Sequence, residues 1–248
     1  MTEDVSSQFA CLTYHKVGEE EDQYTTSEAR LRAQFSFLRA QGYRAEGFEE
    51  LNARLHTRGE LPDRYAVLTF DDGDLSAMHA ADLLEEYGFK ATFFITRDRC
   101  LHKPGFIRTP QVQALRRRGF SLGTHGTTHR KLTRMTVEEC RKELAESRAW
   151  LEDVIGAPIY FTAAPGGFIS TRVLRLVAEQ GYRMLGTCSE RMNTVQKPRG
   201  LQVVRRVNIR RGFSMASFRR ILEGHAGFYL CRQLRSAALW LPKQLLPA

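Results

Sequence analysis

Short apolar segments alternate along this chain with amphipathic segments that end in glycine. The apolar segments have the length of β-strands, and we expect strands at residues 10–14, 66–70, 91–95, 120–124, 159–162, 183–187 and 203–209. The amphipathic segments carry helix start and stop signals, such as the Thr136-x-x-Glu139 capping box and the closing Gly156. This alternation predicts βα units and a parallel sheet. Its natural closed form is a (β/α) barrel, whose functional residues lie at the carboxyl ends of the strands.

The size and composition of the chain agree with one α/β domain. It has 248 residues, of which 42% are hydrophobic and 26% charged, as in ordinary globular proteins. It contains no apolar run of about 18 residues, so no transmembrane helix is expected. The first residues are acidic and lack the pattern of a secretory signal, which favours a cytoplasmic location. The five cysteines are scattered, which indicates neither a disulfide framework nor a cysteine zinc site.

The net charge of +9 is concentrated near the C-terminus. Residues 191–248 hold twelve lysines and arginines and a single acid, Glu223. Such an excess can attract an anionic glycan carrier or lipid headgroups, or can be a solvated surface. No nucleic-acid-binding motif accompanies it, so nucleic acid is not an expected partner.

The C-terminal residues form a separate segment in this interpretation. We expect a barrel domain at residues 1–224 and a basic, apolar helical tail at residues 225–248. Its apolar residues can lie against anionic lipid, which would make the protein peripheral to the inner face of the membrane. More often such residues pack on their own domain or on a partner subunit; they are Phe228, Tyr229, Leu234, Trp240 and Leu241.

Two predicted strands deliver metal-binding chemistry at their carboxyl ends. Asp71 and Asp72 follow the strand at 66–70. Two adjacent carboxylates repel each other, so the pair indicates a bound cation or a different function for each acid. His125 and His129 follow the strand at 120–124, with a spacing that places both imidazoles on one face of a helical turn. Two histidines and one aspartate with open positions are typical of catalytic zinc. The other aspartate can then accept a proton from the attacking water.

Two further strand ends carry candidate site residues. Pro165, Gly166 and Gly167 fit a tight loop that lines a substrate and offers a backbone N–H to an oxyanion, although a plain loop has the same composition. His15 follows the first strand, where a barrel places active-site groups. It is either a member of the site or a hydrogen-bonded histidine at the rim.

The motifs at residues 69–73 (TFDDG) and 125–129 (HGTTH) resemble the first two motifs of the polysaccharide deacetylases, carbohydrate esterase family four with the NodB-homology domain. The resemblance extends over residues 66–209, and residues 12–17 (LTYHKV) are similar to the N-terminal part of members that assemble glycans. It implies a single distorted (β/α)7 barrel that removes N-acetyl, sometimes O-acetyl, groups from sugars with a divalent metal. It implies that Asp71 is the general base and that Asp72, His125 and His129 bind the metal. The expected ion is Zn²⁺, with Co²⁺, Ni²⁺ and Mn²⁺ as alternatives.

The chain departs from the family at three motifs. The family's Arg-x-Pro-x-Gly reads Ala163-Ala164-Pro165-Gly166-Gly167, so the arginine that orients the base is missing at its usual place. The Asp-x-x-Asp-Trp motif has no counterpart, and residues 188–193 (CSERMN) occupy its region. The final Leu-x-His motif is not recognisable, which leaves the general acid unassigned and makes His15 a catalytic candidate.

We therefore expect a metal-dependent deacetylase that acts on an N-acetylated sugar in a glycan or a lipid-linked precursor. Two alternatives stay open. The same barrel could hydrolyse a cyclic imide or another C–N bond, since the missing motifs leave room for a different substrate. A degenerate, non-catalytic protein that binds glycan or membrane is the other alternative.

Overall fold

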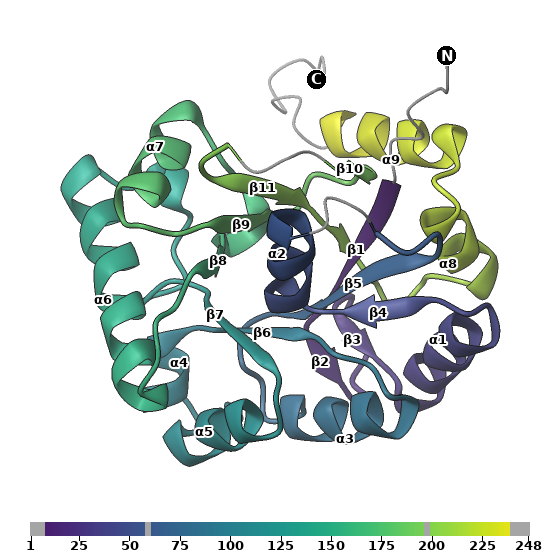
Figure 1. Ribbon diagram of the computed structural model, residues 1–248, viewed down its shortest axis with the longest axis horizontal. Coiled ribbons are helices and arrows are strands. Elements are labelled where there is room, and N and C mark those ends of the chain that lie inside the picture. Colours follow the sequence, from purple (N-terminus) through teal and green to yellow (C-terminus); the bar gives the residue numbers. More distant parts are fainter. Residues whose placement is uncertain (1–7, 58–60, 196–198, 239–248) are drawn as a thin grey trace, which may run out of the picture.

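The computed structural model describes residues 8–57, 61–195 and 199–238. Its central sheet follows the predicted alternation of strand and helix (Figure 1). Six parallel strands lie side by side in chain order: β1 (Gln8–Tyr14), β5 (Tyr65–Phe70), β6 (Thr92–Ile95), β7 (Ser121–Thr124), β8 (Phe161–Ala163) and β9 (Met184–Thr187). The predicted strands are confirmed, with β8 two residues later than expected.

The seventh strand is interrupted, and the interruption closes the barrel. The predicted strand at 203–209 consists of β11 (Gln202–Arg205), which pairs in parallel with β9, and β12 (Val207–Asn208), which pairs in parallel with β1. Arg206 lies between the two pieces and belongs to neither. Because the pieces pair with opposite edges of the sheet, they join those edges into a ring, which confirms the distorted seven-stranded barrel.

Four short strands were not predicted because two or three residues leave too little pattern in the sequence. β4 (Arg44–Glu46) pairs in parallel with the start of β5, and β10 (Asn193–Thr194) pairs in antiparallel fashion with β1. β2 (Lys16–Val17) and β3 (Thr25–Thr26) form a separate pair.

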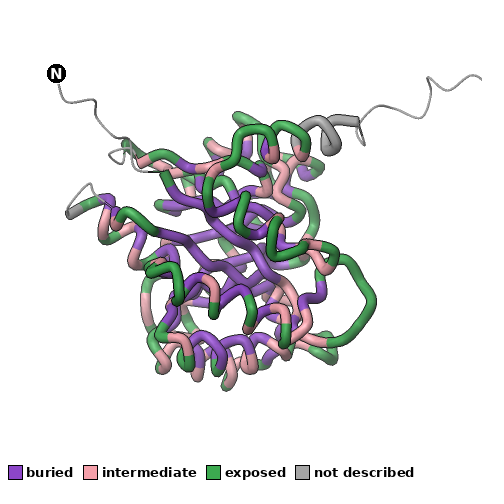
Figure 2. The backbone as a smooth tube through the Cα atoms, turned by 90° about the vertical axis from the view of Figure 1, so that its right-hand side faces the viewer, coloured by how far each residue is buried: buried purple, intermediate pink, exposed green. Residues whose placement is uncertain are grey.

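Helices cover the outside of the barrel, and their buried faces alternate with exposed ones (Figure 2). The predicted capping box begins α6, where the Thr136 N–H donates to Glu139 (2.8 Å) and the Glu139 N–H to Thr136 (3.2 Å). The helices on this layer are α1 (Glu28–Ala40), α3 (Ala77–Tyr87), α4 (Arg97–His102), α5 (Thr109–Arg117), α6 (Val137–Ile155), α7 (Thr171–Glu179) and α8 (Met215–Leu222). Two 3-10 helices, η1 (Leu132–Arg134) and η2 (Pro165–Gly167), lie in loops.

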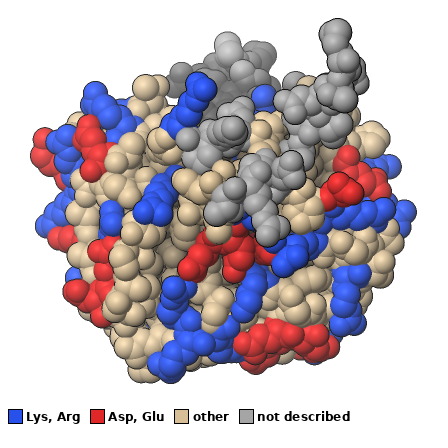
Figure 3. All heavy atoms as spheres, in the orientation of Figure 1, with Lys and Arg blue, Asp and Glu red and all other residues tan. Residues whose placement is uncertain are grey.

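The amino ends of the strands are sealed by α2 (Phe48–Thr57), which lies across the centre of the barrel in Figure 1. The Phe48 ring packs edge-on against Phe94 (5.2 Å between centroids) and Phe161 (6.0 Å). Basic and acidic side chains are interspersed on this face of the molecule (Figure 3). The carboxyl ends of the strands, at the opposite end, are therefore the place where a barrel of this kind can hold a site.

The described part of the C-terminal segment forms α9 (Ala226–Ala238). Tyr229 is buried, and its hydroxyl donates to the Ile221 carbonyl (2.9 Å). This stretch packs on its own domain, which is one of the three expected alternatives. Trp240 and Leu241 lie outside the described residues, and the domain boundary at residue 225 stays a prediction. Among the described helices none is long and apolar enough to cross a bilayer.

Candidate active site

The carboxyl ends of β5 and β7 bring three of the predicted side chains to one centre. Asp72 Oδ1 lies 2.9 Å from His129 Nε2 and 3.6 Å from His125 Nε2. One ligand atom of each residue lies within 4.8 Å of the other two. The predicted ligand set is thus a real cluster in space.

The chemistry of these three donors fits a divalent ion. His125 Nδ1 lies 2.9 Å from the Ala163 carbonyl, a contact that turns Nε2 toward Asp72 and fixes the tautomer in the way metal-bound histidines are fixed. Burial lowers the pKa of His125 to about 4, against the opposing effect of Asp71 and Asp72, so the imidazole is neutral at neutral pH. Asp72 Oδ1 is buried, and it forms ion pairs with His129 and Arg99. Two imidazole nitrogens and a carboxylate oxygen suit Zn²⁺ and similar ions.

The loop that carries the histidines is not the helical turn expected from their spacing. Residues 125–131 are non-helical, and His129 has a φ of 65°. The reason is a tertiary contact with α6: Thr127 Oγ1 donates to the Glu143 carbonyl (3.0 Å), and the Thr128 N–H donates to Glu143 Oε1 (2.6 Å). The prediction of the backbone was wrong, but the two imidazoles still meet, with ring centroids 5.0 Å apart.

Backbone strain is confined to the candidate ligands. Among the described residues, Asp72 (φ 78°) and His129 (φ 65°) are the only non-glycine residues in the left-handed region. Such conformations cost about 1–3 kcal/mol each and persist where surrounding structure holds them. Two of the three candidate metal ligands adopt this conformation, which indicates that the fold places these side chains at a cost in stability.

Arg99 of α4 lies against the same cluster, and no sequence pattern pointed to it. Its Nη1 lies 2.7 Å from Asp72 Oδ1, and its Nη2 lies 3.1 Å from His129 Nδ1. A guanidinium can only donate, so His129 Nδ1 accepts here and Nε2 carries the proton toward Asp72. For His129 Nε2 to bind a cation, that proton has to leave and Arg99 has to withdraw from Nδ1.

Asp71 is paired with a buried arginine that the sequence analysis missed. Arg206, at the break between β11 and β12, is fully buried and grips Asp71 with two hydrogen bonds, Nη1 to Oδ1 (2.7 Å) and Nη2 to Oδ2 (2.8 Å). Burial alone would raise the pKa of Asp71, but Arg206 and His125 outweigh it and hold the pKa below its ordinary value. In place of the arginine that is absent at position 163, the break between β11 and β12 supplies one.

The space for this arginine is provided by a glycine. A Cβ on Gly186 would lie 2.8 Å from Arg206 Nε, so the strand β9 has room for the guanidinium only without a side chain there. A signal was available in the sequence, since the predicted strand at 203–209 contains two arginines where one face has to point into the barrel. An arginine in such a position needs a buried acid.

His15 lies directly after β1, beside the two aspartates. Its ring is 4.8 Å from that of Tyr24, and its buried Nδ1 has no hydrogen-bond partner among the described residues. Burial lowers the pKa of His15, while the charges of Asp71 and Asp72 act to raise it. This orphaned nitrogen next to the carboxylates differs from the hydrogen-bonded rim histidine that was the alternative.

The predicted Pro-Gly-Gly loop forms η2 next to the histidine loop. A Cβ on Gly126 would lie 3.5 Å from Pro165 Cγ, and a Cβ on Gly167 would overlap Cys188. The Gly167 N–H is engaged with the Ala164 carbonyl (2.8 Å), which leaves Gly166 as the candidate oxyanion donor of the two glycines. Whether the loop lines a substrate stays a prediction.

Comparisons with known proteins agree with this geometry. The family model described as polysaccharide deacetylase matches residues 58–185. A peptidoglycan-N-acetylglucosamine deacetylase of Bacillus cereus is 27% identical over 139 residues, which cover 54% of this chain and 62% of that protein. YxkH of Bacillus subtilis, named after the same family, is 23% identical over 86% of this chain and 75% of its own length.

Solved structures show the same fold. A deacetylase of Streptococcus pyogenes, PplD in complex with acetate, superimposes with a TM-score of 0.78 at 20% identity, covering 88% of this chain and 98% of that one. A de-N-acetylase from Aggregatibacter actinomycetemcomitans gives 0.77 at 16% identity, covering 86% of this chain and 99% of that one. With the family model matching more than half of its length, this chain belongs to the polysaccharide deacetylase family, whose members are hydrolases of the carbohydrate esterase type.

Proposed function

We propose that the protein is a divalent-metal-dependent deacetylase that hydrolyses the acetyl amide of an N-acetylated sugar. The observation that carries the proposal is the joint placement of a three-donor cluster and an ionised aspartate, with Asp71 Oδ2 3.7 Å from His125 Nε2. The Bacillus cereus relative, by its name, supports N-acetylglucosamine as the sugar. The excess of arginine and lysine near the C-terminus supports a glycan or lipid-linked precursor with an anionic carrier.

The metal would be held by Asp72, His125 and His129. A divalent ion in this position, with Zn²⁺ the proposed occupant, would acidify a water molecule and polarise the amide carbonyl. The neutral state of His125 favours this binding, because its Nε2 lone pair is available without loss of a proton.

The remaining steps belong to side chains of this chain. Asp71 accepts the proton of the attacking water, because the paired Arg206 keeps its carboxylate charged and oriented. The Gly166 N–H donates to the carbonyl oxygen as negative charge develops there. His15 then passes to the departing amine the proton that Asp71 took from the attacking water, and its lowered pKa means that the ring is neutral beforehand and gives that proton up readily.

The test is acetate release from chitin oligosaccharides by purified protein. Activity should vanish with a chelator, return with Zn²⁺ or Co²⁺, and vanish in Asp71→Asn although that variant keeps its metal. Asp82→Asn, on the exposed surface of α3, is the matched control and should be fully active. Unchanged activity in Asp71→Asn would refute the role of the base, and turnover of a hydantoin in place of the sugar would favour a cyclic imide hydrolase.

A further inference from the structure

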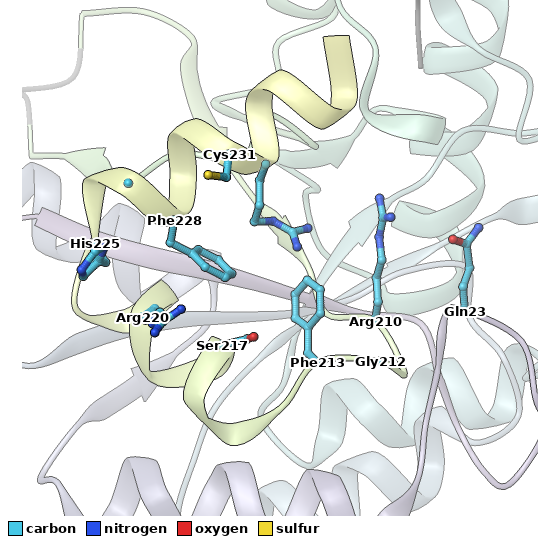
Figure 4. A pocket seen from close by; sticks show the side chains of 11 residues that line it. Gln23, Arg210, Gly212, Phe213, Ser217, Arg220, His225, Phe228 and Cys231 are labelled. Atoms are coloured by element: carbon cyan, nitrogen blue, oxygen red, sulfur yellow. The ribbon is translucent and has the colours of Figure 1, made fainter. Parts of the chain in front are cut away.

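We infer that a cationic pocket beside the candidate active site binds a phosphoryl group. The pocket, here named the α8–α9 pocket, has a volume of about 750 Å³ and lies between α8, α9 and the segment that follows β12 (Figure 4). The residues on which the inference depends are Arg210, Arg220, Arg232, His225, Phe213 and Phe228.

The pocket contains guanidinium groups without counter-ions. Arg232 is paired with Glu190, but neither Arg210 nor Arg220 forms an ion pair with any acid of the described residues. The Nε of Arg210 is buried and has no hydrogen-bond partner among those residues. A buried donor that is left unpaired is costly, so Arg210 indicates an anionic ligand, to which the exposed Arg220 can add its charge.

Hydrogen bonds of neighbouring arginines fix the backbone near Arg210. Arg30 of α1 donates to the Phe213 carbonyl (3.0 Å), and Arg211 donates to the Glu20 carbonyl (2.7 Å). These two contacts tie the segment after β12 to α1 and to the loop that contains Glu20. Arg210 is left to extend into the pocket, as Figure 4 shows.

The walls of the pocket are aromatic. Phe213 and Phe228 point toward one another in Figure 4, and the Arg232 guanidinium lies 4.4 Å from the first ring and 5.6 Å from the second. Planar guanidinium groups bind phosphate oxygens with paired hydrogen bonds. Arg210 and Arg220, which line the same pocket as these rings, therefore suit a phosphoryl group that carries an apolar or sugar substituent.

The loop at Gln23 and Tyr24 connects the pocket with the candidate active site, because Gln23 lines the pocket. The next residue, Tyr24, contacts His15 with its ring. A substrate could thus place its acetyl group near Asp71 and its phosphoryl group in the α8–α9 pocket. That the phosphoryl group belongs to the substrate rests on the proposed function, whereas its binding to the pocket does not.

The test compares ligands with and without the phosphoryl group by isothermal titration calorimetry. In the Asp71→Asn background, which prevents turnover, N-acetylglucosamine 1-phosphate should bind more tightly than N-acetylglucosamine. Arg210→Gln and Arg220→Gln should each weaken the phosphorylated sugar about tenfold. Arg175→Gln, on the exposed face of α7, removes the same charge elsewhere and should leave binding unchanged.

A second arm identifies the source of the phosphoryl group. Phosphatidylcholine vesicles with and without phosphatidic acid are sedimented with the full chain. Binding of the sugar phosphate alone assigns a soluble phosphate ester, and binding that needs phosphatidic acid and is lost in Arg220→Gln assigns a lipid headgroup. Arg220 is exposed, so this variant remains informative where Arg210→Gln does not fold.

Two results would overturn the inference: equal affinity for both sugars together with no preference for phosphatidic acid, or an equal loss of binding in Arg175→Gln. The proposed function fails separately. If acetate is never released but the pocket variants weaken phosphoryl binding, the pocket stands without the deacetylase. If acetate is released, both sugars bind alike and phosphatidic acid is not preferred, the deacetylase stands without the pocket.

Discussion

Asp71 and Arg206 depend on one another. Each carries a full charge with almost no exposure to water, and each satisfies the other through two hydrogen bonds. Removing one partner of such a pair typically costs about 3–5 kcal/mol, because the other charge stays buried. The pair therefore constrains both the stability of the barrel and the charge state of the proposed base.

Arg206→Lys should separate these two roles. Lysine keeps the positive charge but cannot form the paired hydrogen bonds that orient the Asp71 carboxylate. We expect kcat for acetate release to fall roughly 100-fold with an unchanged zinc content, since a small misplacement of a catalytic group has about this effect. Arg205→Lys, at the exposed neighbouring position, is the control; equal kcat values in the two variants would contradict the orienting role.

Arg99→Met should tighten metal binding. The guanidinium contacts Asp72 and His129, where a divalent cation would otherwise meet only neutral or negative groups. Loss of this like charge is expected to lower the Kd for Zn²⁺ about tenfold, measured by competition with a chromophoric chelator. A weaker affinity would mean instead that Arg99 supports the ligand geometry.

The burial of His125 predicts acid sensitivity of the metal-free protein. Its folded-state pKa of about 4 lies below the unfolded value of about 6.5, so the folded state binds fewer protons. The resulting stability is complete above pH 6.5 and is lost as the pH falls toward 4. Between pH 7 and pH 5 the free energy of unfolding in urea should drop by roughly 2 kcal/mol more than in His125→Gln. The same slope in both proteins would exclude His125 as its source.

At the scale of elements, α6 determines the shape of the histidine loop. Glu143 is nearly buried and accepts from both the N–H and the hydroxyl of Thr128, while its carboxylate fills the space beside Gly126. A residue that contacts no ligand directly thus fixes the backbone between two of them.

Glu143→Ala should consequently weaken metal binding without unfolding α6. Supporting residues of this kind typically contribute about 10–100-fold to metal affinity. The visible spectrum of the Co²⁺ form should change as well, because the angles between the donors change. Glu138→Ala, at an exposed position of the same helix, is the control, and an unaltered Co²⁺ spectrum in Glu143→Ala would argue against the positioning role.

The elements differ in how far the sequence could predict them. The strands that hold Asp71 and His125 were predictable, because their apolar runs stop sharply at polar residues. The histidine loop was not, since the i, i+4 spacing contains no information about Glu143 on another element. Arg206 was missed because its partner lies 135 positions earlier in the chain and the break in the seventh strand has no local pattern. The burial of His15 Nδ1 without a hydrogen-bond partner could not be predicted either, because it depends on how β1 packs against the loop that contains Tyr24.

At the scale of the molecule, the two ends of the barrel have separate tasks. The α2 end is closed by aromatic packing around Phe48, whereas the opposite end carries the strained and charged residues. Changes at the sealed end should therefore affect stability more than chemistry.

Phe48→Ala tests this separation. Truncation of a fully buried phenylalanine should lower the free energy of unfolding by about 3–5 kcal/mol. The kcat and the zinc content measured well below the melting temperature should stay within about twofold of the wild type. Val203→Ala, at an exposed site on β11, should change neither property, and a large loss of kcat in Phe48→Ala would show that the two ends are coupled.

The gap between β11 and β12 couples closure of the barrel to the protonation state of Asp71. The segment that joins β9 to β1 also carries Arg206, which is the only arginine paired with Asp71 among the described residues. Before that segment docks, the Asp71 carboxyl would lack the two hydrogen bonds from Arg206 and would favour its protonated form more strongly. A barrel in which β11 and β12 have not docked would then be inactive even with its metal ligands assembled. Hydrolysis would therefore show that folding is complete.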